Sequence, residues 1–507
     1  MAAWCGVAAA AESAPVHFDV HEYRVLGNTV LAIPDVERVL YPLLGDGKTM
    51  ADVEAARGAL EQSYHARGFG TVFVDIPPQS IDEGIVRLRV TEGKINRTRI
   101  DGARYFSERE ILADLPAATT GTVPNLPALQ QQLEAVNTQT PDRSVVPVLK
   151  AGALPGTVDL AFKVNDHLPL HASVELNNQY TPDTRPLRAT LALSYSNLFG
   201  HLDNFAAQYQ TSPQEPSQVG VFAANYAWRP LASGLRPSMY FIDSNSDVAT
   251  IGTIGVLGKG QMLGVRLSYP LVTDASTQSL TLGVDYKHFR ETIDLDAATQ
   301  LATPISYINL SMGYAGSWRS DARQYSFNAS ANFGPRALPN DADGFANKRF
   351  KGRPNYFYLR LDGSYGTALP WDFSLNLRLA GQYAVEPLIS NENFSIAGVD
   401  GVRGFLEAEE LGDQAIKGSV QLQSPPLRWR GTLLGDTFVF YDAGLVSMID
   451  PLPGQSAHTV LRSWGAGLDV LPGGSVTGSL VWADPLVDGP RTPQGEARFL
   501  FLVRGSF

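Results

Sequence analysis

The chain has 507 residues, of which only 18% are charged, and its formal net charge is −11. A nucleic-acid binder is excluded by this acidic balance, because no Lys/Arg-rich run offsets it. A membrane-spanning helix is also excluded, because no stretch of about 18 consecutive apolar residues exists. A transmembrane β-barrel is compatible with the composition, because its strands alternate apolar and polar residues and average to neutral hydropathy.

Residues 1–16 have the pattern of the end of a secretory signal peptide. A small apolar run from Met1 to Ala11 ends in Ala-x-Ala before Glu12, which predicts cleavage after Ala11. Cys5 is the only cysteine of the chain, so the mature protein would contain none. A positively charged start is missing, so the alternatives are a start further upstream and a disordered apolar N-terminus.

Residues 17–95 form a first α/β unit with the order β-α-α-β-β. Apolar residues recur at helical spacing in two segments, and apolar strand patterns flank them. Gly27 and Gly84 are turn signals next to the first and last strands. We expect helices over 34–44 and 50–66, and strands over 21–26, 70–75 and 85–92.

Residues 96–167 repeat this order in a degenerate second copy. We expect strands over 96–100, 145–150 and 157–165, and helices over 107–115 and 127–137. Two tandem copies of one small unit suggest a modular binding arm. The alternative is a pair of ordinary packing domains that bind no partner.

Residues 168–507 change to a period of two, which is typical of strands with one apolar and one polar face. Several runs reach about a dozen residues, longer than the soluble average of about 5–6. Aromatic residues lie near strand ends, where an interfacial girdle would be. We predict an all-β transmembrane barrel of about 16 antiparallel strands, an even number as in bacterial barrels. The alternative is a soluble β-sandwich or solenoid.

One carboxylate and one arginine are unusual in this region. Asp442 interrupts an apolar strand, and an unpaired buried charge costs several kcal/mol. A barrel strand can carry it only on the lumenal face, which Phe440 shares because side chains alternate. Arg403 lies in a glycine-rich loop of about residues 387–413, and its planar fork suits a carboxylate. We predict an Arg403–Asp442 salt bridge that latches this loop inside the lumen, against the alternative of a solvated arginine and a pore-lining aspartate.

Several motifs in the right order resemble the two-partner secretion transporters, the haemolysin-activator family of ShlB, FhaC and HecB. The resemblance covers the chain from about residue 17 to its end. It rests on segments typical of polypeptide-transport-associated (POTRA) domains, and on two segments that match barrels of the BamA-like superfamily. These segments are Gly27-Asn28-Thr29, residues 64–69, 83–95, 141–143 and 155–160, Val402-Arg403-Gly404-Phe405, and Phe440-Tyr441-Asp442 with Gly444.

The resemblance implies two periplasmic α+β POTRA domains followed by a barrel in the outer membrane of a Gram-negative cell. It implies export of one large cognate exoprotein of the haemolysin, adhesin or toxin type, without ATP. The barrel-assembly machinery would recognise the strand that ends in Phe507, and lipid would surround the barrel. Many relatives carry a plug helix before the first POTRA domain. We expect it to be absent here or to lie upstream of Met1.

Client recognition is predicted in the two α/β units, through their strand edges and through arginines that alternate along strands: Arg87, Arg89, Arg97 and Arg99. An ordinary solvated strand face is the alternative. No catalytic motif and no metal or cofactor signature is found, so an enzyme is not predicted. The main alternative function is an insertase of other barrels, and a passive porin or adhesin is a weaker one.

Overall fold

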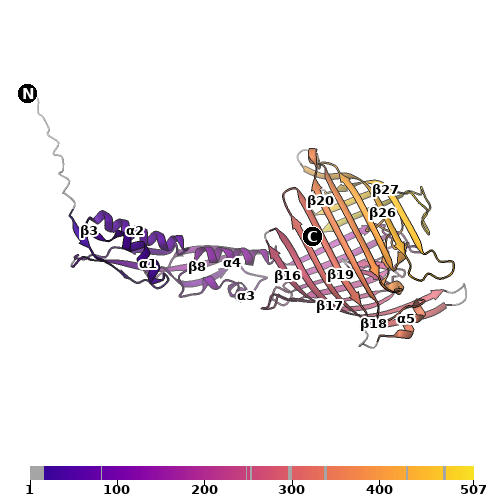
Figure 1. The fold of residues 1–507 in the computed structure, drawn as a ribbon, viewed down its shortest axis with the longest axis horizontal. Helices are drawn as coiled ribbons and strands as arrows, with labels where there is room; N and C mark the ends of the chain where they lie inside the picture. The colour runs from indigo at the N-terminus through magenta and orange to yellow at the C-terminus, as the bar shows by residue number, and fades with distance from the viewer. Residues whose placement is uncertain are drawn as a thin grey trace, which may run out of the picture. The chain divides into compact units, whose positions relative to one another are not determined.

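The computed structural model describes residues 16–81, 83–246, 248–251, 254–273, 275–294, 300–335, 340–429, 432–471 and 475–507. The predicted signal peptide, including Cys5, therefore lies outside the described residues. The chain divides after Pro169 into two compact units. The N-terminal unit carries both α/β copies. The described part of the C-terminal unit is all β apart from one short α-helix and two single 3-10 turns (Figure 1).

The first α/β copy has the predicted order of elements. Its three-stranded sheet has the order β2-β5-β4, with β2 and β5 parallel and β4 and β5 antiparallel. Two short strands, β1 (Phe18–Val20) and β3 (Gly45–Lys48), form an additional pair that the sequence did not predict. The main elements are β2 (Glu22–Leu26), α1 (Ile33–Leu40), α2 (Met50–Ala66), β4 (Val72–Asp75) and β5 (Ile85–Glu92).

Helix α2 shows why this copy folds. Its residues Val53, Ala56, Leu60 and Tyr64 recur every three or four positions, and all are fully buried against the sheet. A capping box with Thr49 starts the helix, because the threonine and the first-turn aspartate satisfy amide groups that have no partner within the helix.

The second copy repeats the topology, with the sheet order β6-β8-β7. Its strands β6 and β8 are parallel, whereas β7 and β8 are antiparallel. Its first helix is two residues shorter at its C-terminal end than predicted, since it ends at Ala113. The elements are β6 (Lys94–Asp101), α3 (Glu108–Ala113), α4 (Leu126–Thr138), β7 (Arg143–Ala151) and β8 (Thr157–Asp166).

The C-terminal unit is a closed antiparallel barrel, which confirms the predicted architecture. Among the described residues sixteen strands form the wall, and the last strand pairs with the first. They are β9 (Leu170–Asn177), β10 (Arg188–Ser196), β11 (Asn204–Thr211), β12 (Gly220–Ala227), β13 (Arg236–Ser244), β16 (Gly260–Thr273), β17 (Ser276–Asp294), β18 (Gln300–Arg319), β19 (Arg323–Phe333), β20 (Phe357–Ala368), β21 (Ser374–Ala384), β24 (Gln414–Gln423), β26 (Thr432–Ser447), β27 (His458–Val470), β28 (Val476–Pro485) and β29 (Arg498–Ser506).

Smaller elements decorate this wall. A hairpin of β14 (Val248–Ile251) and β15 (Ile254–Leu257) extends one loop, and β25 (Leu427–Trp429) pairs with the start of β26. A short helix, α5 (Ala342–Lys348), lies between β19 and β20. No helix in the part of the chain described here is long and apolar enough to cross a membrane.

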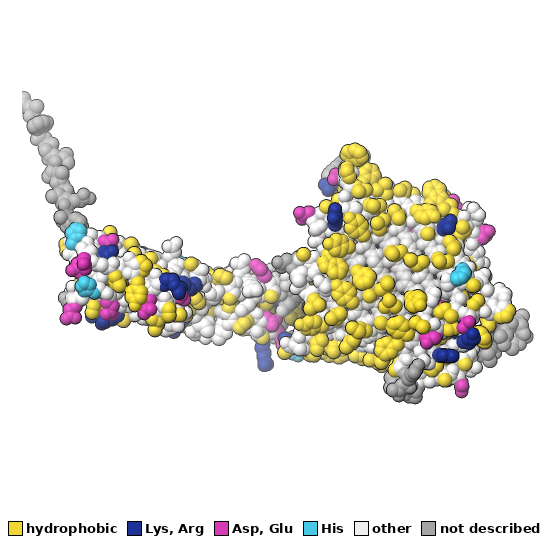
Figure 2. Space-filling view, viewed as in Figure 1, with side chains coloured by type: hydrophobic (Ala, Val, Ile, Leu, Met, Phe, Trp, Pro, Cys, Tyr) yellow, Lys and Arg dark blue, Asp and Glu magenta, His cyan; other side chains and the backbone are white. Residues whose placement is uncertain are grey.

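The two faces of the barrel wall differ as the alternation predicts. On β26 the outward side chains Val439 and Tyr441 are about half exposed, whereas the inward Phe440 is 5% exposed. Figure 2 shows apolar side chains spread over the outer surface, with charged side chains gathered toward its two ends.

The two rims of the barrel differ in loop length. We call the rim at which β9 begins the entry rim, and the opposite one the loop rim. Connections at the entry rim are short, such as residues 320–322 between β18 and β19. Connections at the loop rim are long, such as 334–356 and 385–413, and the second of these carries Arg403.

Candidate functional site

The segment 385–413, which we call the lumenal loop, folds back into the barrel and is largely buried. It contains a helical turn, η4 (Ser390–Glu392), and the two-residue strands β22 (Phe394–Ser395) and β23 (Leu411–Gly412), which pair with each other. Within it, Ile396, Val402 and Phe405 are at most 1% exposed. A buried loop needs internal partners for its polar groups, so its contacts with the wall define the site.

The tip of the loop is held by the pair on which the sequence analysis focused. Arg403 Nε lies 2.7 Å from Asp442 Oδ2, and Arg403 Nη2 lies 2.9 Å from Oδ1, so the contact is bidentate. The backbone amide of Arg403 also donates to Asp442 Oδ2 at 3.1 Å. Asp442 is fully buried, and its two oxygens therefore accept three bonds from this one residue.

Two further guanidinium hydrogens of Arg403 also have partners. Nη1 donates to Gln421 Oε1 and Nη2 to Ser419 Oγ, each at 3.0 Å. Both partners lie on β24, which pairs with β26. The guanidinium carbon also stands 3.4 Å from the ring centroid of Phe440, a cation–π contact. Two strands of the wall and one aromatic face thus fix the arginine from three sides.

Small residues let the loop approach the wall closely. A Cβ added at Gly444 would lie 3.0 Å from Ile396 Cβ and 3.2 Å from Val402 Cγ2, so a glycine at this wall position makes room for the loop. Gly404 has a φ of +99°, which favours glycine. Phe405 packs beside Gly489 in the connection between β28 and β29, where an added Cβ would lie 2.7 Å from the Phe405 ring.

A second anchor lies at the start of the loop, and the sequence analysis missed it. Glu392 is 1% exposed and its Oε1 lies 2.6 Å from Lys287 Nζ on β17. The hydroxyls of Tyr307 and Tyr358 also donate to this carboxylate. Lys287 faces the lumen in an apolar strand context, as Asp442 does. Strand parity could therefore have identified the lysine, but not its partner.

A third anchor closes the loop, and it too was missed. Asp413 is fully buried and accepts from Arg349 Nη2 at 3.2 Å. Its oxygens also accept the backbone amides of Leu388 at 2.9 Å and Ile449 at 2.7 Å. Arg349 follows helix α5, so the connection that carries this helix is tied to the end of the lumenal loop.

A fourth carboxylate ties the loop to the connection before the last strand. Glu409 accepts the amides of Leu406, Arg491 and Thr492, at distances of 2.7–2.8 Å, and the hydroxyl of Thr492 at 2.6 Å. The side chain of Arg491 in turn pairs with Asp183, in the connection after β9, at 2.9 Å. These contacts join segments on both sides of the β9–β29 closure.

The four arginines predicted to recognise the client, Arg87, Arg89, Arg97 and Arg99, are all exposed, but they are not equivalent. Arg89 pairs with Asp75 across the strand pair β4–β5, and this guanidinium lowers the pKa of the carboxyl. Arg99 pairs with Asp101 at 2.8 Å. No carboxylate among the described residues pairs with Arg87 or Arg97. The cationic face is therefore partly neutralised.

The C-terminal residue takes part in barrel closure. The amide of Phe507 donates to Ala172 O at 2.8 Å, and the amide of Ala172 donates to Phe507 O at 3.1 Å. The ring of Phe507 is 80% exposed. The residue thus completes the β29–β9 pairing with its backbone and leaves its side chain free for other contacts.

Comparison with known proteins yields a consistent set of similarities. Residues 156–470 match the family described as haemolysin secretion/activation protein ShlB/FhaC/HecB, and residues 18–93 match the ShlB-type POTRA domain. The heme/hemopexin transporter protein HuxB of Haemophilus influenzae is 23% identical over 486 residues, which cover 92% of this chain and 84% of that one. The outer membrane transporter CdiB of Dickeya dadantii is 22% identical over 405 residues, or 78% and 70% of the two chains.

Solved structures show the same fold. CdiB from Escherichia coli superposes with a TM-score of 0.60 at 19% identity, covering 99% of this chain and 93% of that one. BamA from Haemophilus ducreyi lacking POTRA domains 1–3 gives 0.61 at 13% identity, covering 97% and 100%.

Proposed function

Because the chain belongs to the ShlB/FhaC/HecB family of haemolysin secretion/activation proteins, we propose that it exports one cognate large exoprotein of the haemolysin, adhesin or toxin type. Proteins of this family are outer-membrane transporters with periplasmic POTRA domains. The entry rim of the barrel accordingly faces the periplasm, and the loop rim faces the cell exterior. The observation that carries the proposal is a closed barrel with an anchored lumenal loop, preceded by two POTRA units.

The POTRA units receive the client on this proposal. In the described part of each unit the sheet has two edge strands, β2 and β4 in the first and β6 and β7 in the second. An edge strand offers unpaired backbone groups to an extended segment by strand addition. Arg87 and Arg97, which lack a carboxylate partner among the described residues, would add a contact for acidic or polar client residues.

The lumenal loop is the conformational element of export. Its tip, held by Arg403 and Asp442, fixes how far it extends into the lumen. Folding of the client outside the cell supplies the direction, because a folded domain is about 5–15 kcal/mol more stable than the extended chain that could slide back. ATP is not required by this scheme. Assembly of the barrel itself would use the cell's barrel-assembly machinery and the strand ending in Phe507.

A strain that lacks the chain tests this function. We expect one large protein to disappear from the medium and its precursor to accumulate in the periplasm, while other outer-membrane barrels keep their normal abundance. Complementation with the intact gene should restore export. The fold shared with BamA is the reason for keeping a second candidate function, an insertase of other barrels. A general loss of outer-membrane barrels with no specific loss of a secreted protein would support that function instead.

A further inference from the structure

One wall of the barrel lumen carries no charge along most of its height. On β10 beyond Arg188, and on all of β11 and β12, the residues that face the lumen are uncharged, and none is larger than glutamine. Strand pairing assigns their common face, because outward residues such as Leu193 and Tyr209 are nearly half exposed. The lumen-facing residues are Thr190, Ala192, Ser194, Ser196, Asn204, Ala206, Gln208, Gln210, Val221, Ala223, Asn225 and Ala227. We call this surface the neutral wall.

The facing strands have a different character. Charged side chains face the lumen on β17, β20, β21 and β24. On each of these strands they alternate with exposed apolar residues, which face outward. A second cavity of about 430 Å³ on this side is lined by Arg378, Arg403 and Lys417. The charged residues are Asp285, Lys287, Arg360, Asp362, Arg378 and Lys417. We call the lumen around these residues the charged side. Strand β19, which pairs with β20 there, itself turns only uncharged side chains inward.

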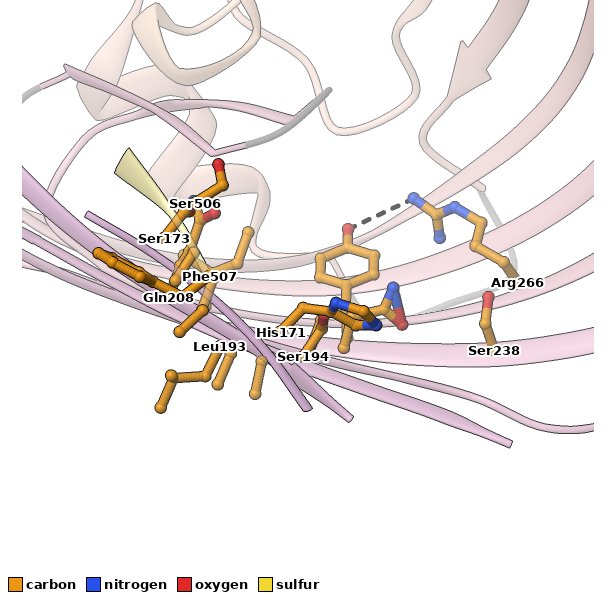
Figure 3. A pocket seen from close by; sticks show the side chains of 18 of the residues that line it. His171, Ser173, Leu193, Ser194, Gln208, Ser238, Arg266, Ser506 and Phe507 are labelled. Carbon is orange, nitrogen blue, oxygen red and sulfur yellow. Dashed lines mark hydrogen bonds between the residues drawn. The ribbon is translucent and has the colours of Figure 1, made fainter. Parts of the chain in front are cut away.

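The neutral wall bounds a cavity of about 880 Å³. It extends from the start of β9 and the last residues of β29, at the entry rim, past Tyr240 on β13 to Arg266 on β16 and Thr281 on β17. In Figure 3 Ser194 and His171 lie on the cavity side of the strands, and Leu193 points away from it. The cavity thus reaches the entry rim, where β9 begins and β29 ends.

Charges at the border of the cavity are already paired. Arg266 donates to both oxygens of Asp285, at 2.5 and 3.0 Å, and Tyr240 donates its hydroxyl to the same carboxylate at 2.6 Å. Arg266 also donates to the Tyr240 hydroxyl at 3.3 Å, the contact drawn in Figure 3. These groups close the edge of the cavity without leaving a free charge to bind a passing chain.

A surface of this kind suits an extended polypeptide that must move. Passage requires binding that is strong enough for entry and weak enough for release. Hydroxyl and amide side chains give neutral hydrogen bonds, which are about half as strong as charge-assisted ones. Alanine and serine side chains leave room for client side chains of any size. Fixed charges would instead hold client residues of the opposite sign.

We propose that the neutral wall is the surface along which the exported protein slides as an extended, unfolded chain, with its backbone bonded transiently to the serine, asparagine and glutamine side chains. This inference rests on the proposed export function, and it adds the surface of the lumen that the client contacts. The charged side of the lumen holds the lumenal loop and does not carry the client.

Two adjacent alanines on β11 provide a matched test of bulk. Ala206 faces the cavity and Ala207 faces outward beside Leu193. Replacing Ala206 by Trp should reduce export of the protein that the deletion strain fails to secrete by about tenfold or more, because the indole ring would project into the cavity through which the client would pass. Ala207→Trp should change export by less than about twofold at equal barrel abundance, since an aromatic ring suits the outer face.

A second substitution changes charge but hardly changes shape, so its effect on export cannot be attributed to misfolding of the barrel. Gln208→Glu should slow export by about five- to tenfold, because the carboxylate forms stronger, charge-assisted bonds with the client. Gln324→Glu on β19 is the control and should export normally, because Gln324 lines the second cavity together with Arg378 and Lys417. Normal export by Gln208→Glu together with a block in Gln324→Glu would overturn the neutral wall as the route.

Cross-linking separates this inference from the function itself. A client carrying one cysteine and a stably folded C-terminal domain should stall during export. In a chain with Cys5 replaced, it should form a disulfide with Ala206→Cys but not with Ser330→Cys on β19. Disulfides only at position 330 would overturn the route while leaving export intact. If the deletion strain secretes every protein normally, the export function itself is wrong.

Discussion

Removal of the Arg403 side chain is the perturbation with the clearest expected magnitude. Arg403→Ala deletes both contacts to Asp442 and leaves a fully buried carboxylate without its cation. Removing one partner of a buried pair costs about 3–5 kcal/mol. Val402 and Phe405 stay packed, and the backbone amide of residue 403 still donates its hydrogen bond to Asp442. We therefore expect the seated position of the loop to be destabilised by about 3 kcal/mol, which corresponds to a roughly hundredfold larger population of released loop.

Thiol labelling measures this population directly. Ala397 is 4% exposed within the loop, so Ala397→Cys, in a chain with Cys5 replaced, should react slowly with an aqueous maleimide. Arg403→Ala should accelerate labelling by about two orders of magnitude. The matched control is Arg378→Ala. The side chain of this lumenal arginine is 59% exposed, and its ion pair with Asp400 is long, at 4.0 Å, so its loss should cost little. The control should leave the rate unchanged.

The double variant tests the physical reason for the effect. Adding Asp442→Ala to Arg403→Ala removes the uncompensated charge, so labelling should fall back toward the wild-type rate. Export of the client should fall with Arg403→Ala. Unchanged labelling and normal secretion in both Arg403→Ala and Asp442→Ala would refute the latch.

Three further predictions concern the anchors and the N-terminal unit. Glu409→Ala should increase thiol labelling of the connection that holds Thr492, because the carboxylate accepts three backbone amides that then lose their partner. Labelling is measured at Thr492→Cys, which already lacks the hydroxyl donor, and equal labelling with and without Glu409 would contradict this link. Gly444→Val should displace the loop by steric overlap with Ile396 and Val402, and it should accelerate Ala397→Cys labelling as the loss of the latch does. Slow labelling in that variant would contradict this prediction, because it would mean that the wall adjusts to the valine. The Thr49 amide and hydroxyl lower the pKa of Asp52, so the bonds of this carboxylate stabilise the fold above its unfolded pKa of about 4 and are lost as the pH falls through the lower folded value. Asp52→Asn should therefore remove part of the acid dependence of hydrogen-exchange protection in α2, and an unchanged profile would contradict it.

Much of the fold follows from patterns that act over short distances. Helical spacing in α2 and alternation in β26 are set by residues a few positions apart, and both elements lie where the sequence predicts them. The pairs β1–β3 and β14–β15 were not predicted, because strands of three or four residues leave too short a pattern. The Arg89–Asp75 pair depends on the register between β4 and β5, which no local signal in either strand fixes.

The site shows the same division. Strand parity places Asp442 in the lumen, and the chemistry of a buried carboxylate requires a cation there. Glu392 and Asp413 lie in irregular backbone, which has no periodicity to assign a face. Their partners, Lys287 and Arg349, are more than sixty residues away along the chain. Such pairs are fixed by how the loop folds into the barrel, which only the tertiary structure provides.

Export through the lumen is tested most directly by a client that stalls during export and blocks the barrel. A client fused to a stably folded C-terminal domain should remain threaded in the barrel, with its N-terminus accessible to protease outside the cell. The purified complex should conduct far less current in a planar lipid bilayer than the empty barrel with its latch removed by Arg403→Ala. A client that never reaches the exterior, or a complex that conducts like the empty barrel, would contradict the central claim.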